Sequence, residues 1–305
     1  MMATESSVAS LPKPVADLRL LHDSVRVLGF GKPYDWSLRH YVRNPTEEQV
    51  RERTSAPALF LPQIATEREY NLRKMLYAPS PREFNAEVCT EADVMDSSSR
   101  VELRSELFHN TCTLLRGAHA DGIAPLSQGY TYVVSPAGCP IIIVRDQVTG
   151  TVGVAHAGMR SLIDEGRLKG EAPRKYESVV MSLFEGLRAR GVSDLSRVEV
   201  VILFSIDPQV FDYTWDNEKF GSLNEKRTEE LARLWGPEAI YDYTSLTERR
   251  LGRPDLTAII KSQCISLGVL PEHIQVVDSP SDQEWHHTRQ GGDTLARNLV
   301  LVQHL

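Results

Sequence analysis

A short stretch that ends at a histidine constrains the fold of this chain more than any other feature. Residues 140–144 form an apolar run rich in β-branched side chains, residues 146–150 (DQVTG) are typical of a turn, and residues 151–156 resume an apolar-rich run. Two such runs on either side of turn residues predict a β-hairpin. Its second strand ends at His156, which lies among small residues in the sequence VAHAGMRS. A strand-end histidine with such neighbours has little packing purpose, and the small side chains leave room for a ligand to approach the imidazole.

Further strands and helices are expected around this hairpin. Short apolar or β-branched runs predict strands at residues 131–134, 198–204, 239–243, 274–277 and 298–302. Apolar residues recur at helical spacing within residues 173–190, 225–235 and 255–267. Asp255 is the expected N-cap of the last helix, and Gly191 and Gly268 are expected to end two of the helices. Strands mixed with helices, with hairpins among them, indicate an α+β fold, that is, a domain of mixed α/β layers.

The first hundred residues differ from the rest of the chain. They are rich in Pro, Arg, Glu and Ser, with short apolar runs such as residues 56–61 between polar ones. Residues 93–99 (DVMDSSS) are typical of a linker or loop. We therefore place a boundary near Arg100, which divides an N-terminal region, residues 1–99, from a core domain, residues 100–305.

Composition excludes several classes of function. The chain is 41% hydrophobic and 25% charged, with a net charge of −7, which argues against a nucleic-acid-binding surface. It has no run of eighteen or more apolar residues, so no membrane span is expected. The first residues lack the long apolar segment of a secretory signal. The four cysteines form no C-x-x-C pair and suit a reducing compartment, so we expect a cytoplasmic protein.

Cys139 and His119 are the residues that could join His156 in a metal site. Thiolate and imidazole are good zinc ligands, and three protein ligands with an open fourth position are typical of catalytic zinc. The spacing between these three residues is long and irregular, so ordinary structural roles stay open. A cysteine before a strand is commonly a buried small hydrophobe. His119 lies in a Gly/Ala-rich turn, where a histidine is commonly a solvated loop residue. His286 and His287 are adjacent, so in a strand they would point to opposite faces. We expect that pair at the surface or facing a substrate.

Several blocks of the sequence resemble, in order, those of one known family. Residues 118–123 (AHADGI), 135–141 (SPAGCPI) and 154–162 (VAHAGMRSL) are similar to its blocks VHGxxV, TADCxPV and VHAGWRGL. Three later blocks also match the family. Its IGP turn is similar to residues 205–208, its DL…QL…GV helix to residues 255–269, and its C-terminal block to residues 285–302. This is the laccase-domain, or multicopper-polyphenol-oxidase-type, family, whose members have been reassigned as purine nucleoside phosphorylases with deaminase activity.

The resemblance implies a single core with a central mixed β-sheet and flanking helices, preceded here by an N-terminal extension. It also implies that zinc is bound by His119, Cys139 and His156, beside a pocket for phosphate and for a purine nucleoside, either adenosine or inosine. Two departures from the family's pattern lie next to these ligands. Gly138 stands where the family has an aspartate before the cysteine, and Met159 stands where it has a tryptophan.

The resemblance also suggests which side chains act on the substrates. The planar fork of donors of arginine suits phosphate, so Arg160, Arg289 and Arg297 are the candidates for binding it. A structural salt bridge is the alternative role for Arg160. Deamination would need a carboxylate that moves protons, and Asp121 and Asp207 are the candidates for that role.

Two other interpretations stay open at the level of sequence. In a Cys-His hydrolase or deamidase, Cys139 would be the nucleophile and His156 its base. In a catalytically degenerate member, the zinc would stabilise the fold or the chain would bind a partner. Copper-dependent oxidation of phenols is the least expected activity, because the sequence has no dense histidine-rich pattern for several copper ions.

Overall fold

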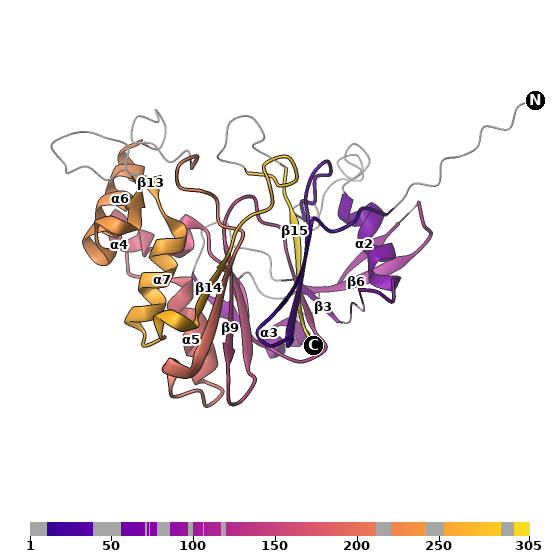
Figure 1. Cartoon of the computed structure of the whole chain (residues 1–305), viewed down its shortest axis with the longest axis horizontal. Helices are drawn as coiled ribbons and strands as arrows, with labels where there is room; N and C mark the ends of the chain where they lie inside the picture. The colour runs from indigo at the N-terminus through magenta and orange to yellow at the C-terminus, as the bar shows by residue number, and fades with distance from the viewer. Residues whose placement is uncertain are drawn as a thin grey trace, which may run out of the picture.

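The protein has two large β-sheets packed against each other, with helices on the outer face of each (Figure 1). The computed structural model describes residues 11–38, 56–70, 72, 74–77, 86–96, 100–105, 107–116, 120–211, 221–241, 253–287 and 296–305. Helices α4 to α7 lie on the outer face of one sheet, and α2 lies on the outer face of the other. The expected α+β fold with mixed sheets is therefore confirmed, and its strands are divided between two large sheets.

The sheet next to α4–α7 has six strands in the order β14-β11-β9-β10-β7-β4. Its strands are β4 (Val88–Cys89), β7 (Gly122–Leu126), β9 (Ile141–Asp146), β10 (Val152–His156), β11 (Val198–Leu203) and β14 (Ile274–Val277). β9 and β10 are the predicted hairpin, antiparallel, with His156 opposite Ile141. β11 pairs with β9 antiparallel and with β14 in parallel, so the sheet is mixed.

The second sheet has seven strands in the order β1-β2-β15-β8-β3-β6-β5. They are β1 (Ala16–Leu20), β2 (Val25–Phe30), β3 (Met75–Tyr77), β5 (Arg100–Arg104), β6 (Thr111–Arg116), β8 (Thr131–Val134) and β15 (Leu299–His304). β12 (Ile240–Tyr241) and β13 (Arg253–Pro254) form a separate two-stranded antiparallel ribbon. Of the strand expected over residues 239–243, Ala239 ends a short 3-10 turn, residues 240–241 form β12, and the last two positions lie outside the described residues.

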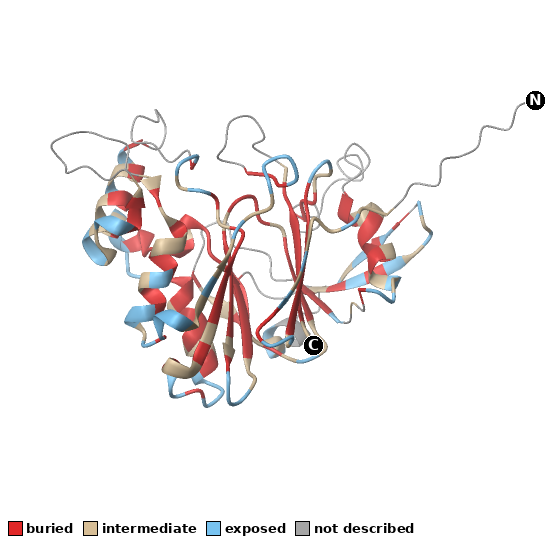
Figure 2. Cartoon of the chain, viewed as in Figure 1, coloured by how far each residue is buried: buried red, intermediate tan, exposed pale blue. Residues whose placement is uncertain are grey.

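Continuous apolar strands form because both faces of each sheet are covered. In β11, Val200 and Ile202 pack towards the helices, whereas Val201 and Leu203 pack towards the other sheet. β15 behaves in the same way, with Val300 and Val302 in the core between the sheets and its alternate residues facing α2. Figure 2 shows the buried residues concentrated along the strands of both sheets. The core between the sheets therefore holds the two halves of the molecule together.

The helices begin and end where capping residues allow. Asp255 caps α7 (Leu256–Ser266) by accepting a hydrogen bond from the backbone N–H of Ala258, as predicted. α5 (Val179–Arg188) begins later than expected, because Ser178 accepts from the N–H of Met181. The other helices are α2 (Ala56–Thr66), α3 (Glu91–Asp96), α4 (Glu165–Lys169) and α6 (Gly221–Trp235). No helix in the described ranges is both long and apolar enough to cross a bilayer.

Strands from both sides of Arg100 share the sheets. β3 lies between β8 and β6 in the seven-stranded sheet, and β4 pairs in parallel with β7 in the six-stranded sheet. The division of the chain near Arg100 stays a prediction, and these pairings show that strands of residues 1–99 are built into both sheets.

Candidate functional site

The end of β10 brings together two of the segments that the sequence singled out. The backbone N–H of His156 donates to the carbonyl of Asp121 at 2.7 Å, and the N–H of Ala157 donates to the carbonyl of Pro140 at 2.8 Å. Cys139 directly precedes Pro140, and Asp121 directly precedes β7. His156 therefore lies between the segment that carries Cys139 and the segment that carries Asp121, at one edge of the six-stranded sheet.

His156 is nearly buried at this edge, with 8% of its surface exposed. Val152 and Val154 of the same strand pack in the core between the sheets, and the alternation of side chains along a strand puts His156 on that face. Burial, and then the positive charge of Arg297, lower the pKa of His156 to about 4. The imidazole is therefore neutral near pH 7, which is the form that can bind a metal ion.

The third predicted zinc ligand, His119, lies outside the described residues. Cys139 is half-buried and forms no disulfide. Within the described ranges, which lack His119, no three His, Cys, Asp or Glu side chains are grouped as a metal site requires. The zinc set of His119, Cys139 and His156 therefore stays a prediction, of which the backbone geometry around Cys139 and His156 is described.

Asp121 is fully buried beside His156. Its Oδ2 accepts a hydrogen bond from the N–H of Ala86 at 3.0 Å, and Oδ1 has no hydrogen-bond partner among the described residues. Burial raises the pKa of Asp121 to about 7, although the bond from Ala86 and the charges of Arg174 and Arg160 oppose the rise. Such a carboxyl group can hold or release a proton near neutral pH.

Asp207, the second predicted carboxylate, has a different setting. It is exposed, and its Oδ1 accepts a hydrogen bond from the N–H of Gln209 at 2.8 Å, which makes it a turn residue after β11. Of the two candidates, Asp121 is the one whose backbone contacts His156.

The predicted phosphate-binding arginines also differ from one another. Arg297 precedes β15 of the seven-stranded sheet, is mostly buried, and is close enough for its charge to act on His156 of the other sheet. Arg160 lies just after the His156 edge, where its Nε is 3.0 Å from Oε2 of Glu165. The structural ion pair considered for Arg160 is thus present. Arg289 lies outside the described residues.

Glu165 is the centre of a buried ion-pair network. Its carboxylate is 1% exposed and contacts Arg160, Lys169 at 3.7 Å and Arg227, whose own side chain is 7% exposed. Because Glu165 and Arg227 are both buried, removal of either one would leave the charge of the other without its partner.

The two departures from the family's pattern have structural reasons. Met159 is buried in the core between the six-stranded sheet and the helices, so it acts in packing. Gly138 has φ +97°, a conformation that L side chains rarely adopt. Its carbonyl accepts from the N–H of Ile206 at 2.8 Å. Phe204, at the end of β11, has φ +58°, which is uncommon for a bulky residue.

Of the two positions expected for His286 and His287, the surface is wrong, and a position facing a substrate stays a prediction. Both are buried, because the segment that carries them is fixed between the two sheets. Asn298 accepts from the N–H of His286 at 2.8 Å and donates to its carbonyl at 2.9 Å. The preceding Trp285 is fully buried in the core between the sheets. The only signal in the sequence was the aromatic residue before the pair, which marks an anchored segment.

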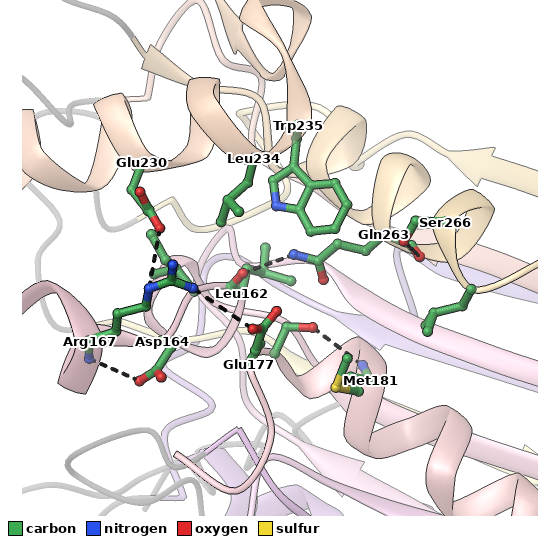
Figure 3. A pocket seen from close by; sticks show the side chains of 13 residues that line it. Leu162, Asp164, Arg167, Glu177, Met181, Glu230, Leu234, Trp235, Gln263 and Ser266 are labelled. Atoms are coloured by element: carbon green, nitrogen blue, oxygen red, sulfur yellow. Dashed lines mark hydrogen bonds and ion pairs between the residues drawn. The ribbon is translucent and has the colours of Figure 1, made fainter. Parts of the chain in front are cut away.

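A separate cavity lies among the helices (Figure 3). It encloses about 490 Å³, part of it open to solvent, and its walls come from the segment after His156 and from α4, α5, α6 and α7. The amide Nε2 of Gln263 donates to the carbonyl of Leu162 at 2.9 Å, and Arg167 lies 4.0 Å from both Glu177 and Glu230. The cavity contains none of the site residues predicted from the sequence.

Comparisons with known proteins agree with this architecture. The structure is similar to the Bacillus licheniformis hypothetical protein YfiH (TM-score 0.58, 15% identity, 92% of this chain and 93% of that one). It is also similar to YlmD from Geobacillus stearothermophilus (TM-score 0.52, 17% identity, 92% and 91%) and to a Neisseria meningitidis protein of family DUF152 (TM-score 0.53, 13% identity, 97% of each). At these identities the likeness concerns the fold alone.

A comparison with curated proteins found no match. The model of one family, described as multi-copper polyphenol oxidoreductase laccase, matches residues 87–294. That match covers more than half of the chain and includes the Asp121, Cys139 and His156 segments. This protein belongs to the multi-copper polyphenol oxidoreductase laccase family.

Proposed function

We propose that the protein is a zinc-dependent purine nucleoside phosphorylase, with an adenosine deaminase activity at the same site, acting on adenosine or inosine. The observation that supports this most is the position of His156. It ends β10 between the Cys139 segment and the Asp121 segment, whose backbone carbonyl accepts its N–H, and the charge of Arg297 reaches it from the other sheet.

The residues of this edge fit a zinc ion by their chemistry. His156 offers a neutral imidazole and Cys139 a thiol sulfur, which are both preferred zinc ligands. His119, two residues before Asp121, would be the third ligand. A bound zinc would supply a Lewis acid and lower the pKa of a water molecule towards 7.

The chain's own residues would bind and orient the substrates. The buried guanidinium of Arg297 would hold phosphate through its fork of donors, and burial strengthens that attraction because the local dielectric constant is low. Asp121 would hold or release a proton next to His156. Arg160 is held by Glu165, so its contribution would be the positive charge that it adds near Asp121. Arg289 remains a candidate for the same anion.

The test combines metal analysis with turnover. Purified wild type, His156→Ala and Cys139→Ser are analysed for zinc and copper, and then assayed with adenosine and inosine with and without phosphate. We expect about one zinc per wild-type chain, little in either variant, and phosphate-dependent release of the free base by wild type alone. Wild type without zinc, or zinc-loaded wild type that converts neither nucleoside, would contradict the proposal.

The same experiment separates the Cys-His hydrolase. A thiolate bound to zinc is a poor nucleophile, so metal-free wild type that is inactivated by a thiol reagent would favour Cys139 as the nucleophile. Copper at the site together with oxidation of phenols would instead favour the activity in the family's description.

A further inference from the structure

His287 is a buried imidazole next to the Cys139 segment that the resemblance does not assign to the site. It is 7% exposed. A Cβ atom placed on Gly138 would stand 3.0 Å from its Nδ1, so this nitrogen faces the backbone of the residue that precedes Cys139. The imidazole therefore lies on the side of the Cys139 segment that Gly138 leaves open.

The two nitrogens of this ring have different surroundings. Nε2 is 3.5 Å from Oδ1 of Asp282, whose carboxylate is largely exposed. Nδ1 is buried, and none of the described residues makes a hydrogen bond with it. A neutral histidine carries a proton on one nitrogen and a lone pair on the other. The carboxylate of Asp282 favours the proton on Nε2, so Nδ1 is left as an acceptor.

The surroundings also keep the ring neutral. Burial lowers the pKa of His287, and the charges of Lys32 and His286 lower it further, against the opposing effect of Asp282. A buried acceptor without a partner reduces stability unless a ligand or a water molecule supplies the missing donor. The backbone of this segment is fixed, because Trp285 is buried between the sheets and Asn298 binds both backbone groups of His286.

We propose that Nδ1 of His287 is a substrate-binding atom of this site, which accepts a hydrogen bond from an O–H or N–H group of the bound nucleoside. The inference rests on the proposed function and extends it. A lone pair attracts a donor and repels phosphate oxygens, so His287 would contact the nucleoside and Arg297 the phosphate. Each of the two substrates would thus be recognised by a different side chain.

A pair of substitutions distinguishes the two nitrogens. In His287→Asn the amide lies close to the position of Nδ1, and in His287→Gln it lies close to the position of Nε2. We expect H287N to keep the KM for adenosine within about threefold of wild type, and H287Q to raise it about tenfold or more. Zinc content and the midpoint of urea unfolding are measured for both, since a purely structural role through Asp282 would make H287N the weaker variant.

Adenosine analogues provide a second measurement that does not depend on H287Q folding. Adenosine has four donor groups, and 2′-deoxy-, 3′-deoxy- and 5′-deoxyadenosine and purine riboside each lack one of them. His287→Ala is expected to weaken the binding of adenosine but not of the one analogue that lacks the group bound by Nδ1. Equal weakening for all five nucleosides, or the same KM for H287N and H287Q, would overturn the inference while wild-type activity preserved the proposed function. Wild type that binds no nucleoside would overturn both.

Discussion

Gly138 and His287 occupy adjoining space, so that a side chain at position 138 would press tightly against the imidazole. A Cβ there would be 3.0 Å from Nδ1 of His287, and the backbone of Gly138 has φ +97°. An aspartate, which the family resemblance leads one to expect before Cys139, would therefore be strained in this backbone and would need a small shift of the His287 ring. The absence of a side chain at position 138 is what leaves space for the imidazole at position 287.

We expect Gly138→Ala to destabilise the protein by two separable effects. The left-handed backbone costs an L residue about 1–2 kcal/mol, and the contact with His287 adds about 1–3 kcal/mol, as overpacking does elsewhere. Urea unfolding of Gly191→Ala supplies the control, because Gly191 has φ +87° and open space around its Cβ position. A loss of unfolding free energy no larger than that of the control would show that the His287 ring shifts without cost and that the contact is not destabilising. The double variant Gly138→Ala/His287→Ala should recover the difference.

Glu165 should be among the most sensitive charged residues in the chain. Its removal leaves Arg227 buried without its carboxylate, and breaking a buried pair in this way costs about 3–5 kcal/mol. We expect that loss for Glu165→Gln in chemical denaturation. Glu185→Gln is the matched control, since its pair with Arg188 is exposed on α5 and should contribute less than about 1 kcal/mol. Equal effects would contradict the assignment of Glu165 as a buried centre.

Arg297 and Arg160 should respond differently to removal of their charge. We expect Arg297→Met to raise the KM for phosphate at least about tenfold with little change in zinc content, because a bidentate donor to the anion is lost. Arg160→Met should lower stability more than it changes that KM, because its guanidinium already binds Glu165. Phosphate titrations at saturating nucleoside give the KM for phosphate, and unfolding curves give the stability of each variant. The reverse pattern would assign phosphate to Arg160.

The pH dependence of stability should include a contribution from Asp146. Burial alone would raise the pKa of this carboxyl, but hydrogen bonds from Thr149 and the charge of Arg197 outweigh it and lower the pKa below its usual value. A lowered pKa in the folded state means that the stabilisation is complete well above the ordinary value of 3.8 and is lost as the pH falls through the folded-state value. Asp146→Asn should therefore flatten the fall in unfolding free energy below pH 4. An unchanged slope would refute this.

Much of the fold could be predicted because its strands are covered on both faces. The hairpin of β9 and β10, the strand β11 and the helix α7 follow from apolar runs, turn residues and the Asp255 cap. The division of the strands into two sheets could not be predicted, because β3, β8 and β15 pair with residues distant in sequence. The local sequence of a strand does not show which distant strand it will pair with.

The candidate site was predictable only in part, for a similar reason. Cys139, His156 and Asp121 come together through neighbouring strands of one sheet, so the order of blocks in the sequence was enough to suggest them. The sequence left His287 either at the surface or facing a substrate, because the choice depends on Trp285 and Asn298, which fix its segment between the sheets. Adjacent histidines suggest an exposed pair until that anchoring is known.

His156 and Arg297 come from different sheets, and the side chains packed between these sheets determine how far apart the two lie. The apolar core is thus a spacer that sets the width of the site. Shortening a residue such as Val154 or Val302 would narrow or tilt that spacing without touching any group that meets the substrate. Under the proposed function, relatives whose cores differ in volume are expected to accept nucleosides of different size.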